Sequence, residues 1–500
     1  MHPNNLSLSQ KRQPFRTLIR QSWFRHLLLT ASALFCASQF QVYQTAVVNN
    51  LGAFVQNWTT ATHYNANVEL STQWLWPMYV ALHGVGKMLG TVLSIFTVDR
   101  FGRRPTSATL AFLLLASGVL VLIARYVDSF ELLCVSRVFG GAVGGAGIVS
   151  SSLLLSEAPP TRWRGYFSGI TTIYFGLGDV LSLLVTLPSL LATSSGWAWA
   201  IAIGFIGPAL FAIPVSLWTH ESPRQLYLTV RTKGTDNDVA NATRHRAKVH
   251  QAILFYQGAD NLQRAMEELE LERTDHNDAV TYADILRRGD LRRAALLILV
   301  VFSSYQLCGV TLTMTYSTNI MQLAGLPFAW ATYGSLLISI VKFVSSFPIP
   351  SAVEFWGRRN CCLVGIVGCS SSLLFIGLLF LVATSSVAVG FIVGVALAVN
   401  MTVFNLVSGA GNTLQCELVT QQVRAKVTAS CQAIGWLLQA VFAFVLPVLM
   451  DGLHPSVPFF ALPALQLLAF VYLYRRLHET MNRSIAQIQD SERTTLLSKD

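Results

Sequence analysis

Three charged side chains with the capacity for chemistry lie inside long apolar stretches of this sequence: Lys87, Asp179 and Lys342. Charged groups in a membrane-spanning segment are energetically costly, so they usually pair with each other or take part in function. Such lysines can therefore hold a carboxylate of the protein, or they can attract an anionic substrate such as urate or another organic acid. No nucleophile–histidine–acid arrangement, phosphate-binding loop or metal-ligand spacing accompanies them, so the sequence predicts neither an enzyme nor a cofactor.

The elements that position these charges are related by an internal duplication. Three markers recur in one order: Gly-Arg-Arg at Gly102 and Gly357 (357 − 102 = 255), a Glu–Arg pair starting at Glu157 and Glu417 (417 − 157 = 260), and a His-Glu dipeptide starting at His220 and His478 (478 − 220 = 258). The common spacing indicates two copies of one membrane unit. Lys87 and Lys342 each precede the glycine of this motif by 15 residues (102 − 87 and 357 − 342), so they are equivalent.

The composition is typical of an integral membrane protein. Hydrophobic residues make up 53% of the 500 residues and charged residues only 12%, and a stretch of about 20 apolar residues can span a bilayer. Of the 35 Lys and Arg residues, all but Lys87, Arg125, Arg137 and Lys342 lie in segments that we assign to the cytoplasm. The net charge of +10 therefore sets the topology and does not indicate nucleic-acid binding.

The apolar stretches predict an all-α membrane protein with 12 transmembrane helices, six plus six, and both termini in the cytoplasm. The expected helices span 27–49, 73–98, 106–126, 129–155, 164–190, 196–218, 294–319, 328–353, 360–383, 386–413, 424–448 and 455–476. The corresponding domains are a cytoplasmic tail (1–25), a six-helix bundle (26–218), a cytoplasmic helical linker (219–292), a second six-helix bundle (293–476) and a second tail (477–500). Within the linker, the pattern of 261–273 predicts an amphipathic helix lying against the cytoplasmic face.

Short sequence signals bear on location. The loop expected at 50–72 has no Lys or Arg and carries a sequon at Asn57, which predicts an extracellular, glycosylated loop. The eight cysteines lie in or beside apolar stretches, so we expect no disulfide framework. Near the C-terminus, Glu492–Leu497 fits an acidic dileucine signal, which would direct a plasma-membrane protein to endosomes or lysosomes.

Charged residues recur at the cytoplasmic helix ends of both copies. Arginines there can bind carboxylates in charge-assisted bidentate pairs, which would join the bundles while the inner gate is closed and break when it opens. The alternative is that these arginines only fix the topology. The residues concerned are Arg103, Arg104, Glu157, Arg164, Glu221, Arg224, Glu354, Arg358, Arg359, Glu417, Arg424 and Glu479.

These motifs resemble those of the sugar-porter branch of the major facilitator superfamily, and within it the animal facilitative glucose transporters. The resemblance covers about residues 25–483. It rests on Asp99–Arg104, Glu157 with Arg164, Glu221–Arg224, Glu354–Arg359, Glu417 with Arg424, Gln306–Gly309 and the sequon. It implies the major facilitator fold, in which two six-helix bundles rock around a central site and expose it to each side in turn.

The resemblance also implies a substrate site, which this sequence matches in part. Positions that agree with the family are Gln306, Tyr316 and Trp436, and positions where the family has an amide or tryptophan and this chain differs are Tyr305, Thr311, Ser339, Thr172 and Asn412. Sites built for hydroxyl groups discriminate through paired donors and acceptors, so the missing amides leave the identity of the sugar open. Thr172 and Ser339 can alternatively be small packing residues. Two family prolines fall on Gly409 and Gly411, where a hinge would rely on the conformational freedom of glycine.

The resemblance further bears on mechanism. Proton-coupled relatives carry an acid after the tyrosine that corresponds to Tyr43, and this chain has Gln44 there, which favours uniport. Asp179 leaves proton coupling as an alternative. In the implied fold, helix five packs against helix eight and helix two against helix eleven, so we expect a Lys342–Asp179 ion pair and a Lys87–Gln439 hydrogen bond between the halves.

The sequence therefore predicts facilitative transport of a hexose or related polyol across the plasma membrane. The expected partners are a small-molecule substrate and the lipid bilayer, with no nucleic acid. An organic-anion carrier of the same fold and a non-transporting nutrient sensor are the alternatives.

Overall fold

The computed structural model of the chain consists of helices and the segments between them. It describes residues 21–39, 41–63, 69–160, 163–232, 239–274, 282–418 and 421–479, and within these ranges it contains no β-strand. The dileucine-like sequence Glu492–Leu497 lies outside the described residues. The prediction of an all-α fold is confirmed.

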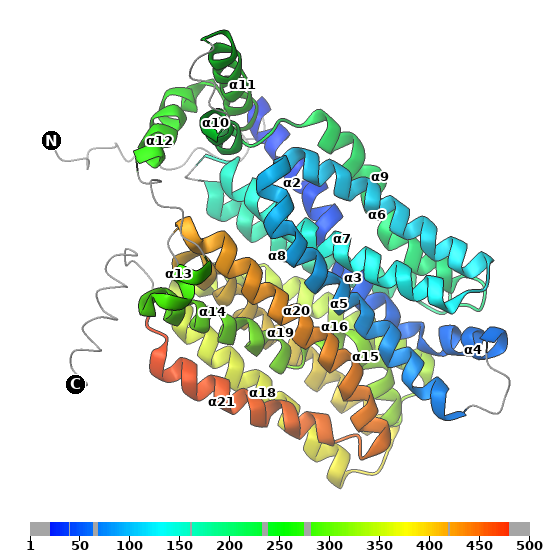
Figure 1. Cartoon of the computed structure of the whole chain (residues 1–500). Coiled ribbons are helices and arrows are strands. Elements are labelled where there is room, and N and C mark those ends of the chain that lie inside the picture. Colours follow the sequence, from blue (N-terminus) through cyan, green and yellow to red (C-terminus); the bar gives the residue numbers. More distant parts are fainter. Residues whose placement is uncertain are drawn as a thin grey trace.

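The helices form two bundles, which short linker helices connect (Figure 1). The first bundle contains α2 (Ser22–Gln39), α3 (Gln41–Ala46), η2 (Val47–Asn50), α5 (Glu69–Phe101), α6 (Arg103–Tyr126), α7 (Phe130–Glu157), α8 (Arg164–Val185) and α9 (Trp197–Trp218). The second contains α14 (Gly289–Leu307), α15 (Val310–Leu323), α16 (Phe328–Ser346), α17 (Ile349–Trp356), α18 (Arg358–Val382), α19 (Val387–Glu417), α20 (Gln421–Gly452) and α21 (Val457–Arg476). The linker contains α10 (Pro223–Thr232), α11 (Val239–Gln257), η5 (Ala259–Asn261), α12 (Leu262–Thr274) and α13 (Tyr282–Arg287).

The two ends of the molecule differ. The linker helices lie at one end, called here the linker end, together with the start of α2 and the last turn of α21 (Figure 1). Helix α4 (Gly52–His63) projects from the opposite end, called here the α4 end. The sequence pattern assigns the linker end to the cytoplasm and the α4 end to the outside.

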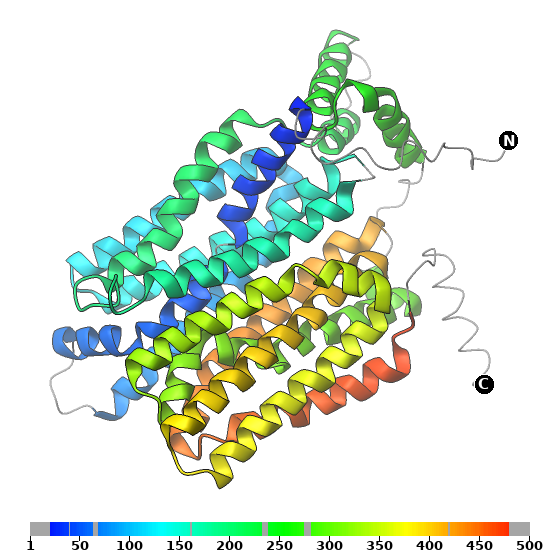
Figure 2. The ribbon, with the colours of Figure 1, turned by 180° about the vertical axis from the view of Figure 1, so that it is seen from behind.

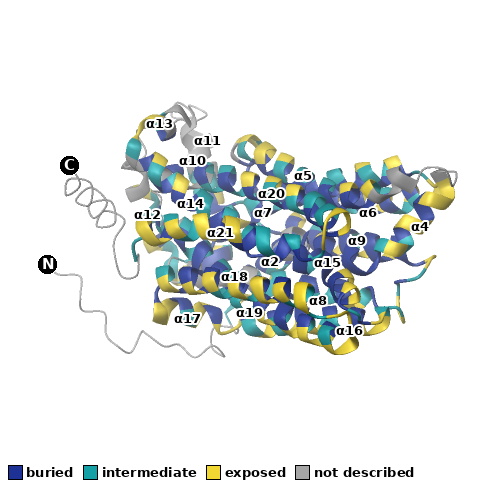
Figure 3. Ribbon diagram, turned by 90° about the horizontal axis from the view of Figure 1, so that it is seen from below, coloured by how far each residue is buried: buried dark blue, intermediate teal, exposed yellow. Residues whose placement is uncertain are grey.

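Ten helical stretches among the described residues are long and apolar enough to cross a membrane. The segments α2 to η2 and α8 occupy the two remaining positions of the six-plus-six order. Exposed residues lie on the outward faces of the bundles, while buried residues lie between the helices (Figure 3). Many of the exposed side chains are large and apolar, such as Phe96 and Leu468, as expected for surfaces that face lipid.

The bundles meet along two long helix pairs, α5 against α20 and α8 against α16, and both views of the ribbon show the bundles side by side (Figures 1 and 2). Each pair is brought close by a glycine. A Cβ added at Gly84 would lie 2.8 Å from the Cβ of Ala440, and one at Gly176 would lie 2.7 Å from Phe343 Cδ2. Small residues of this kind let membrane helices approach closely.

Several predicted helices are interrupted. The stretch 294–319 is divided between α14 and α15 at Gly309, which has φ +78°, and the stretch 328–353 ends as a single helix at Ser346 before α17 begins. The stretch 27–49 is divided among α2, α3 and η2, and the expected loop 50–72 contains α4 and the start of α5. Apolar periodicity does not report such breaks, because the hydrophobicity continues across them.

The linker docks onto the first bundle through aromatic contacts. Phe255 of α11 lies 4.6 Å from the ring of His26 and 4.6 Å from that of His220. Burial and the nearby Arg104 lower the pKa of His220, which favours the neutral ring in this contact. The predicted amphipathic helix is present as α12, and its apolar side packs against Val249 and Ile253 of α11.

Candidate functional site

The break between α14 and α15 brings an amide and a hydroxyl group together. Gly309 adopts a left-handed conformation that ends α14 and redirects the chain. Across this break, the Thr311 hydroxyl donates to Gln306 Oε1 at 2.6 Å. This bond uses the acceptor of the amide, so the Gln306 NH₂ group can donate to a ligand. The buried hydroxyls of Thr313 and Thr315 have no hydrogen-bond partner among the described residues.

Two tyrosines predicted to contact substrate hold helices together. The Tyr305 hydroxyl donates to the Ser408 carbonyl at 3.2 Å, and a Cβ on Gly411 would collide with that hydroxyl. The Tyr316 hydroxyl donates to the Ala443 carbonyl of α20 at 2.8 Å. Gly411 therefore allows close packing against Tyr305 within the continuous helix α19, and a glycine hinge at Gly409 and Gly411 stays a prediction.

The other predicted contact residues are dispersed. Ser339 is buried on α16, and Asn412 Oδ1 accepts from Gln415 on the same helix at 3.4 Å. Trp436 lies on α20, and its indole Nε1 is buried without a hydrogen-bond partner among the described residues. The side chain of Thr172 lies outside the described residues, although its backbone is part of α8.

Both contacts predicted between the halves are present. Lys342 Nζ lies 3.1 Å from Asp179 Oδ2, and both side chains are buried between α16 and α8. Lys87 Nζ donates to Gln439 Oε1 at 3.1 Å and also to Thr45 Oγ1 at 3.1 Å. The same ammonium group lies 4.7 Å above the Trp436 ring centroid, within the range of a cation–π contact.

Arg137 is a fully buried cation for which the sequence analysis predicted no role. Its guanidinium donates to Gln44 Oε1 at 3.1 Å and to the Gln44 carbonyl at 2.6 Å. It also lies 5.1 Å from the Tyr79 ring. A charged residue within an apolar stretch was a usable signal, because the same signal identified Lys87.

Hydrogen bonds join the two bundles at the α4 end. Asn49 Nδ2 donates to Ser317 Oγ at 2.8 Å, and Asn49 Oδ1 accepts from the Thr318 amide at 3.1 Å. The Thr318 hydroxyl donates to Asn50 Oδ1 at 2.7 Å. We call Asn49, Asn50, Ser317 and Thr318 the asparagine latch. No motif in the sequence pointed to these residues.

At the linker end, two glutamates cap helices in the same way in both repeats. Glu221 accepts from the backbone amides of Arg103 and Arg104 at the start of α6, and Glu479 accepts from those of Arg358 and Arg359 at the start of α18. A helix N-terminus is a favourable site for a carboxylate. The prediction that these two glutamates bind arginine side chains is therefore incomplete, because backbone amides hold them.

Two arginine–carboxylate pairs accompany these caps. Arg103 Nη2 lies 3.1 Å from Glu157 Oε1, and Arg358 Nη2 lies 3.1 Å from Glu417 Oε1. Each of these two pairs joins helices of one bundle. The expectation that such pairs tie the bundles together applies to a closed inner gate and stays a prediction.

The remaining predicted gate residues have other environments. Arg104 and Arg359 donate to the backbone carbonyls of Leu217 and Tyr474. Arg224 belongs to α10 and lines a small pocket with Glu157, and Glu354 is exposed on α17. Arg164 and Arg424 belong to α8 and α20, but their side chains lie outside the described residues.

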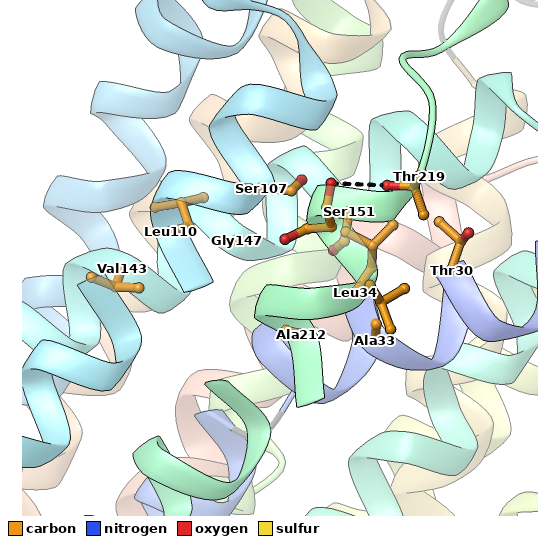
Figure 4. A pocket seen from close by; sticks show the side chains of 12 residues that line it. Thr30, Ala33, Leu34, Ser107, Leu110, Val143, Gly147, Ser151, Ala212 and Thr219 are labelled. Atoms are coloured by element: carbon orange, nitrogen blue, oxygen red, sulfur yellow. Dashed lines mark hydrogen bonds between the residues drawn. The ribbon is translucent and has the colours of Figure 1, made fainter. Parts of the chain in front are cut away.

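A cavity of about 20 Å³ lies inside the first bundle and is lined by hydroxyl and apolar side chains that include Ser107, Ser151 and Thr219 (Figure 4). Its size suits about one water molecule and not a sugar. Among the described residues, no group of His, Cys, Asp and Glu could hold a metal ion. Asn57 is exposed on α4, and its glycosylation stays a prediction.

Comparison of the sequence with known proteins identifies the family of this chain. The sequence profile of the family described as "Sugar (and other) transporter" matches residues 29–491. The human solute carrier family 2, facilitated glucose transporter member 7 is 24% identical over 478 residues, which cover 92% of this chain and 89% of that protein. Human member 5 is 24% identical over 481 residues, with 92% and 91% covered.

Solved structures share the fold. The xylose transporter XylE of E. coli in a partially occluded inward open conformation superposes with a TM-score of 0.75 at 16% identity, covering 92% of this chain and 100% of that chain. XylE bound to 6-bromo-6-deoxy-D-glucose superposes with a TM-score of 0.73 at 16% identity, covering 93% and 99%.

Proposed function

This chain belongs to the sugar transporter family, and on that basis we propose that it carries a hexose or a related polyol across the membrane as a uniporter. It has the major facilitator fold and is a multi-pass membrane protein of a transporter family, not an enzyme. The observation that carries the substrate proposal is the break between α14 and α15, where the Gln306 amide accepts from Thr311 and the buried Thr313 and Thr315 hydroxyls have no hydrogen-bond partner among the described residues. Groups of this kind recognise sugar hydroxyls.

The contacts at the two ends support alternating access. The asparagine latch joins the bundles at the α4 end, whereas the Arg103–Glu157 and Arg358–Glu417 pairs at the linker end each lie within one bundle. This combination fits a state that is closed to the outside and able to open to the cytoplasm. Transport then requires the latch to break while the linker-end surfaces approach each other.

The surroundings of Gln44 support uniport. Proton-coupled relatives have an acid at this position, and the amide here cannot release a proton. Gln44 instead accepts from Arg137 through its side chain and its backbone carbonyl. The described residues around that guanidinium therefore supply no carboxylate whose protonation could be linked to substrate binding.

Uptake of labelled hexoses and polyols into proteoliposomes tests this proposal, with the purified chain at two external pH values. We expect saturable uptake that does not respond to an imposed proton gradient. Uptake that follows the proton gradient would contradict uniport. A reconstituted chain that moves no sugar or polyol would contradict transport and favour a sensor.

A matched pair of variants tests the site. Gln306→Ala removes a donor to a substrate hydroxyl, so kcat/KM for the transported sugar should fall roughly 5- to 100-fold. Gln322→Ala changes the same residue type at an exposed position of α15 and should leave uptake unaltered. Equal uptake by both variants would remove Gln306 from the site. Surface biotinylation of cells that express the chain tests the proposed plasma-membrane location.

A further inference from the structure

Lys87 is a buried lysine for which the described residues supply no counter-ion. Only 2% of its surface is exposed, and its hydrogen-bond partners, Thr45 and Gln439, are neutral. The ammonium group has three donors, of which these partners take two. The Trp436 ring below it offers only a weak attraction for the charge.

The charged group that interacts with Lys87 most directly among the described residues is another basic side chain, Arg137. Arg137 of the adjacent helix α7, with 1% of its surface exposed, interacts electrostatically with Lys87. Gln44 satisfies two of its nitrogens through neutral oxygens, and Arg137 Nε has no hydrogen-bond partner among the described residues. His83, one turn before Lys87 on α5 (87 − 83 = 4), is also buried and adds no negative charge.

The equivalent lysine of the second repeat has a counter-ion. Lys342 occupies the position equivalent to Lys87, and Asp179 supplies its counter-ion at 3.1 Å. Asp179 lies 15 residues after Arg164 (179 − 164) and Gln439 lies 15 residues after Arg424 (439 − 424), so these two positions are equivalent as well. The Lys87 side therefore has a hydrogen bond to Gln439 where the Lys342 side has a carboxylate. Burial of an unpaired charge is strongly unfavourable, which means that an anion from outside the chain would be stabilised here.

Unused donors lie beside this charge. The Trp436 indole Nε1 is buried without a partner among the described residues, and Gly435 next to it faces Phe302 of α14 with a separation of 3.8 Å from an added Cβ. Further along α20, the Ala443 carbonyl accepts from Tyr316 of α15. Helix α20 therefore contacts Lys87 of the first bundle through Gln439, and it contacts Tyr316 of α15 through Ala443.

From this arrangement we infer that the transported substrate is a monoanionic sugar acid, such as a hexuronate, whose carboxylate binds Lys87 while its ring hydroxyls bind the Gln306 side of the site. The inference rests on the proposed transport function and narrows its substrate class. An ammonium group and an indole N–H are both donors to a carboxylate. The amide of Gln306 and the hydroxyls of α15 suit a polyol ring, which a simple fatty acid or an inorganic anion lacks.

A uniporter that carries a monoanion moves net charge across the membrane, whereas one that carries a neutral sugar does not. A membrane potential therefore distinguishes the two substrates. In proteoliposomes with a potassium diffusion potential, labelled D-glucuronate should accumulate about tenfold at roughly 60 mV, inside positive. Labelled D-glucose, which has the same ring without the charge, should show no potential-dependent accumulation. Glucuronate uptake that exceeds glucose uptake and follows the potential supports the inference.

The other outcomes are distinct. Glucose uptake without glucuronate uptake would overturn the sugar-acid inference and leave the proposed function intact. Absence of uptake for both sugars would overturn both proposals. Glucuronate uptake that ignores the potential would also contradict the inference, because it would require a coupled ion that the scheme does not contain.

Substitutions test whether Lys87 is the residue that binds the carboxylate of the substrate. Lys87→Gln should lower kcat/KM for glucuronate at least tenfold relative to that for glucose, and Lys87→Arg should restore part of the preference. The control is the double variant Asp179→Asn with Lys342→Gln, which removes one charge of each sign from the other interface and should leave the ratio unaltered. An unchanged ratio in Lys87→Gln would refute the role of Lys87. Thermal stabilisation of the purified variants by glucuronate provides a binding readout if a variant does not transport.

Discussion

At the scale of single residues, the position of a charge in the repeat determined what the sequence could predict. Lys342–Asp179 and Lys87–Gln439 followed from equal spacings to the duplicated motifs together with the helix pairing that the family resemblance implies, and both contacts are present at 3.1 Å. The role of Tyr305 could not be predicted in this way. Its hydroxyl binds the Ser408 carbonyl because Gly411 leaves room for it, and that packing depends on the distance between two helices rather than on a local pattern.

The buried Lys342–Asp179 pair gives a stability prediction. Lys342→Gln leaves Asp179 as a buried carboxylate without its cation, and such a loss typically costs about 3–5 kcal/mol. Asp179 Oδ1 lacks a hydrogen-bond partner among the described residues, so these residues offer the carboxylate no second donor that could compensate. We expect a clearly lower apparent Tm in detergent for this single variant.

Two double variants complete this experiment. Asp179→Asn with Lys342→Gln removes both charges and should regain much of the lost stability. The exchange Asp179→Lys with Lys342→Asp keeps the pair and should preserve transport if the two groups only pair. A Tm for Lys342→Gln equal to that of the unaltered chain would show that the pair does not stabilise the fold. A folded but inactive exchange variant would indicate contact with the substrate.

At the scale of secondary-structure elements, the helix ends were less predictable than the helices. The charged motifs marked the starts of α6 and α18, but the way in which they are capped was missed. Gly102 and Gly357 have φ +97° and +85°, and the Cβ that each lacks would lie within about 2.5 Å of the capping carboxylate of Glu221 or Glu479. Sequence patterns locate a turn of this kind, whereas its partner comes from a segment more than 100 residues later.

The cap on α6 leads to a prediction about Gly102. In Gly102→Ala, the added Cβ meets Glu221 Oε2 at 2.5 Å and the backbone stays in the left-handed region, where a side chain is strained at a cost of about 1–3 kcal/mol. The apparent Tm should fall. Gly207→Ala is the control, because nothing lies within 4 Å of its Cβ in the middle of α9, and alanine is the better helix former by about 1 kcal/mol. Equal Tm values for the two variants would contradict the account of the cap.

At the scale of the whole molecule, the fold and the existence of two halves could be predicted, but the conformational state could not. Apolar stretches, basic residues and the repeat are properties of the sequence. The relative position of the bundles depends on contacts such as the asparagine latch, whose members are ordinary polar residues in the sequence. The same limit applies to the substrate, because an unpaired Lys87 is recognisable only once its neighbours are known to be neutral.

The asparagine latch therefore gives a prediction about the equilibrium between conformations. Asn49→Ala removes two hydrogen bonds between the bundles, those to Ser317 and to the Thr318 amide. At about 0.5–1.5 kcal/mol for each bond, the population that is open at the α4 end should rise roughly 5- to 100-fold. The exposed Asn319, two residues after Ser317 on α15, provides the matched control variant Asn319→Ala.

A cysteine on α15, two residues before Ser317 of the asparagine latch, can report the change in the population that is open at the α4 end. Thr315 is buried on α15, so in Thr315→Cys a membrane-impermeant maleimide added outside the cell should react slowly. Combination with Asn49→Ala should accelerate the labelling by a factor in the predicted range, and combination with Asn319→Ala should leave the rate unaltered. The chain without the added cysteine sets the background. A labelling rate that Asn49→Ala does not change would mean that the latch does not hold the α4 end closed, and the closure would then have to come from the packing of α15 against α3 and η2.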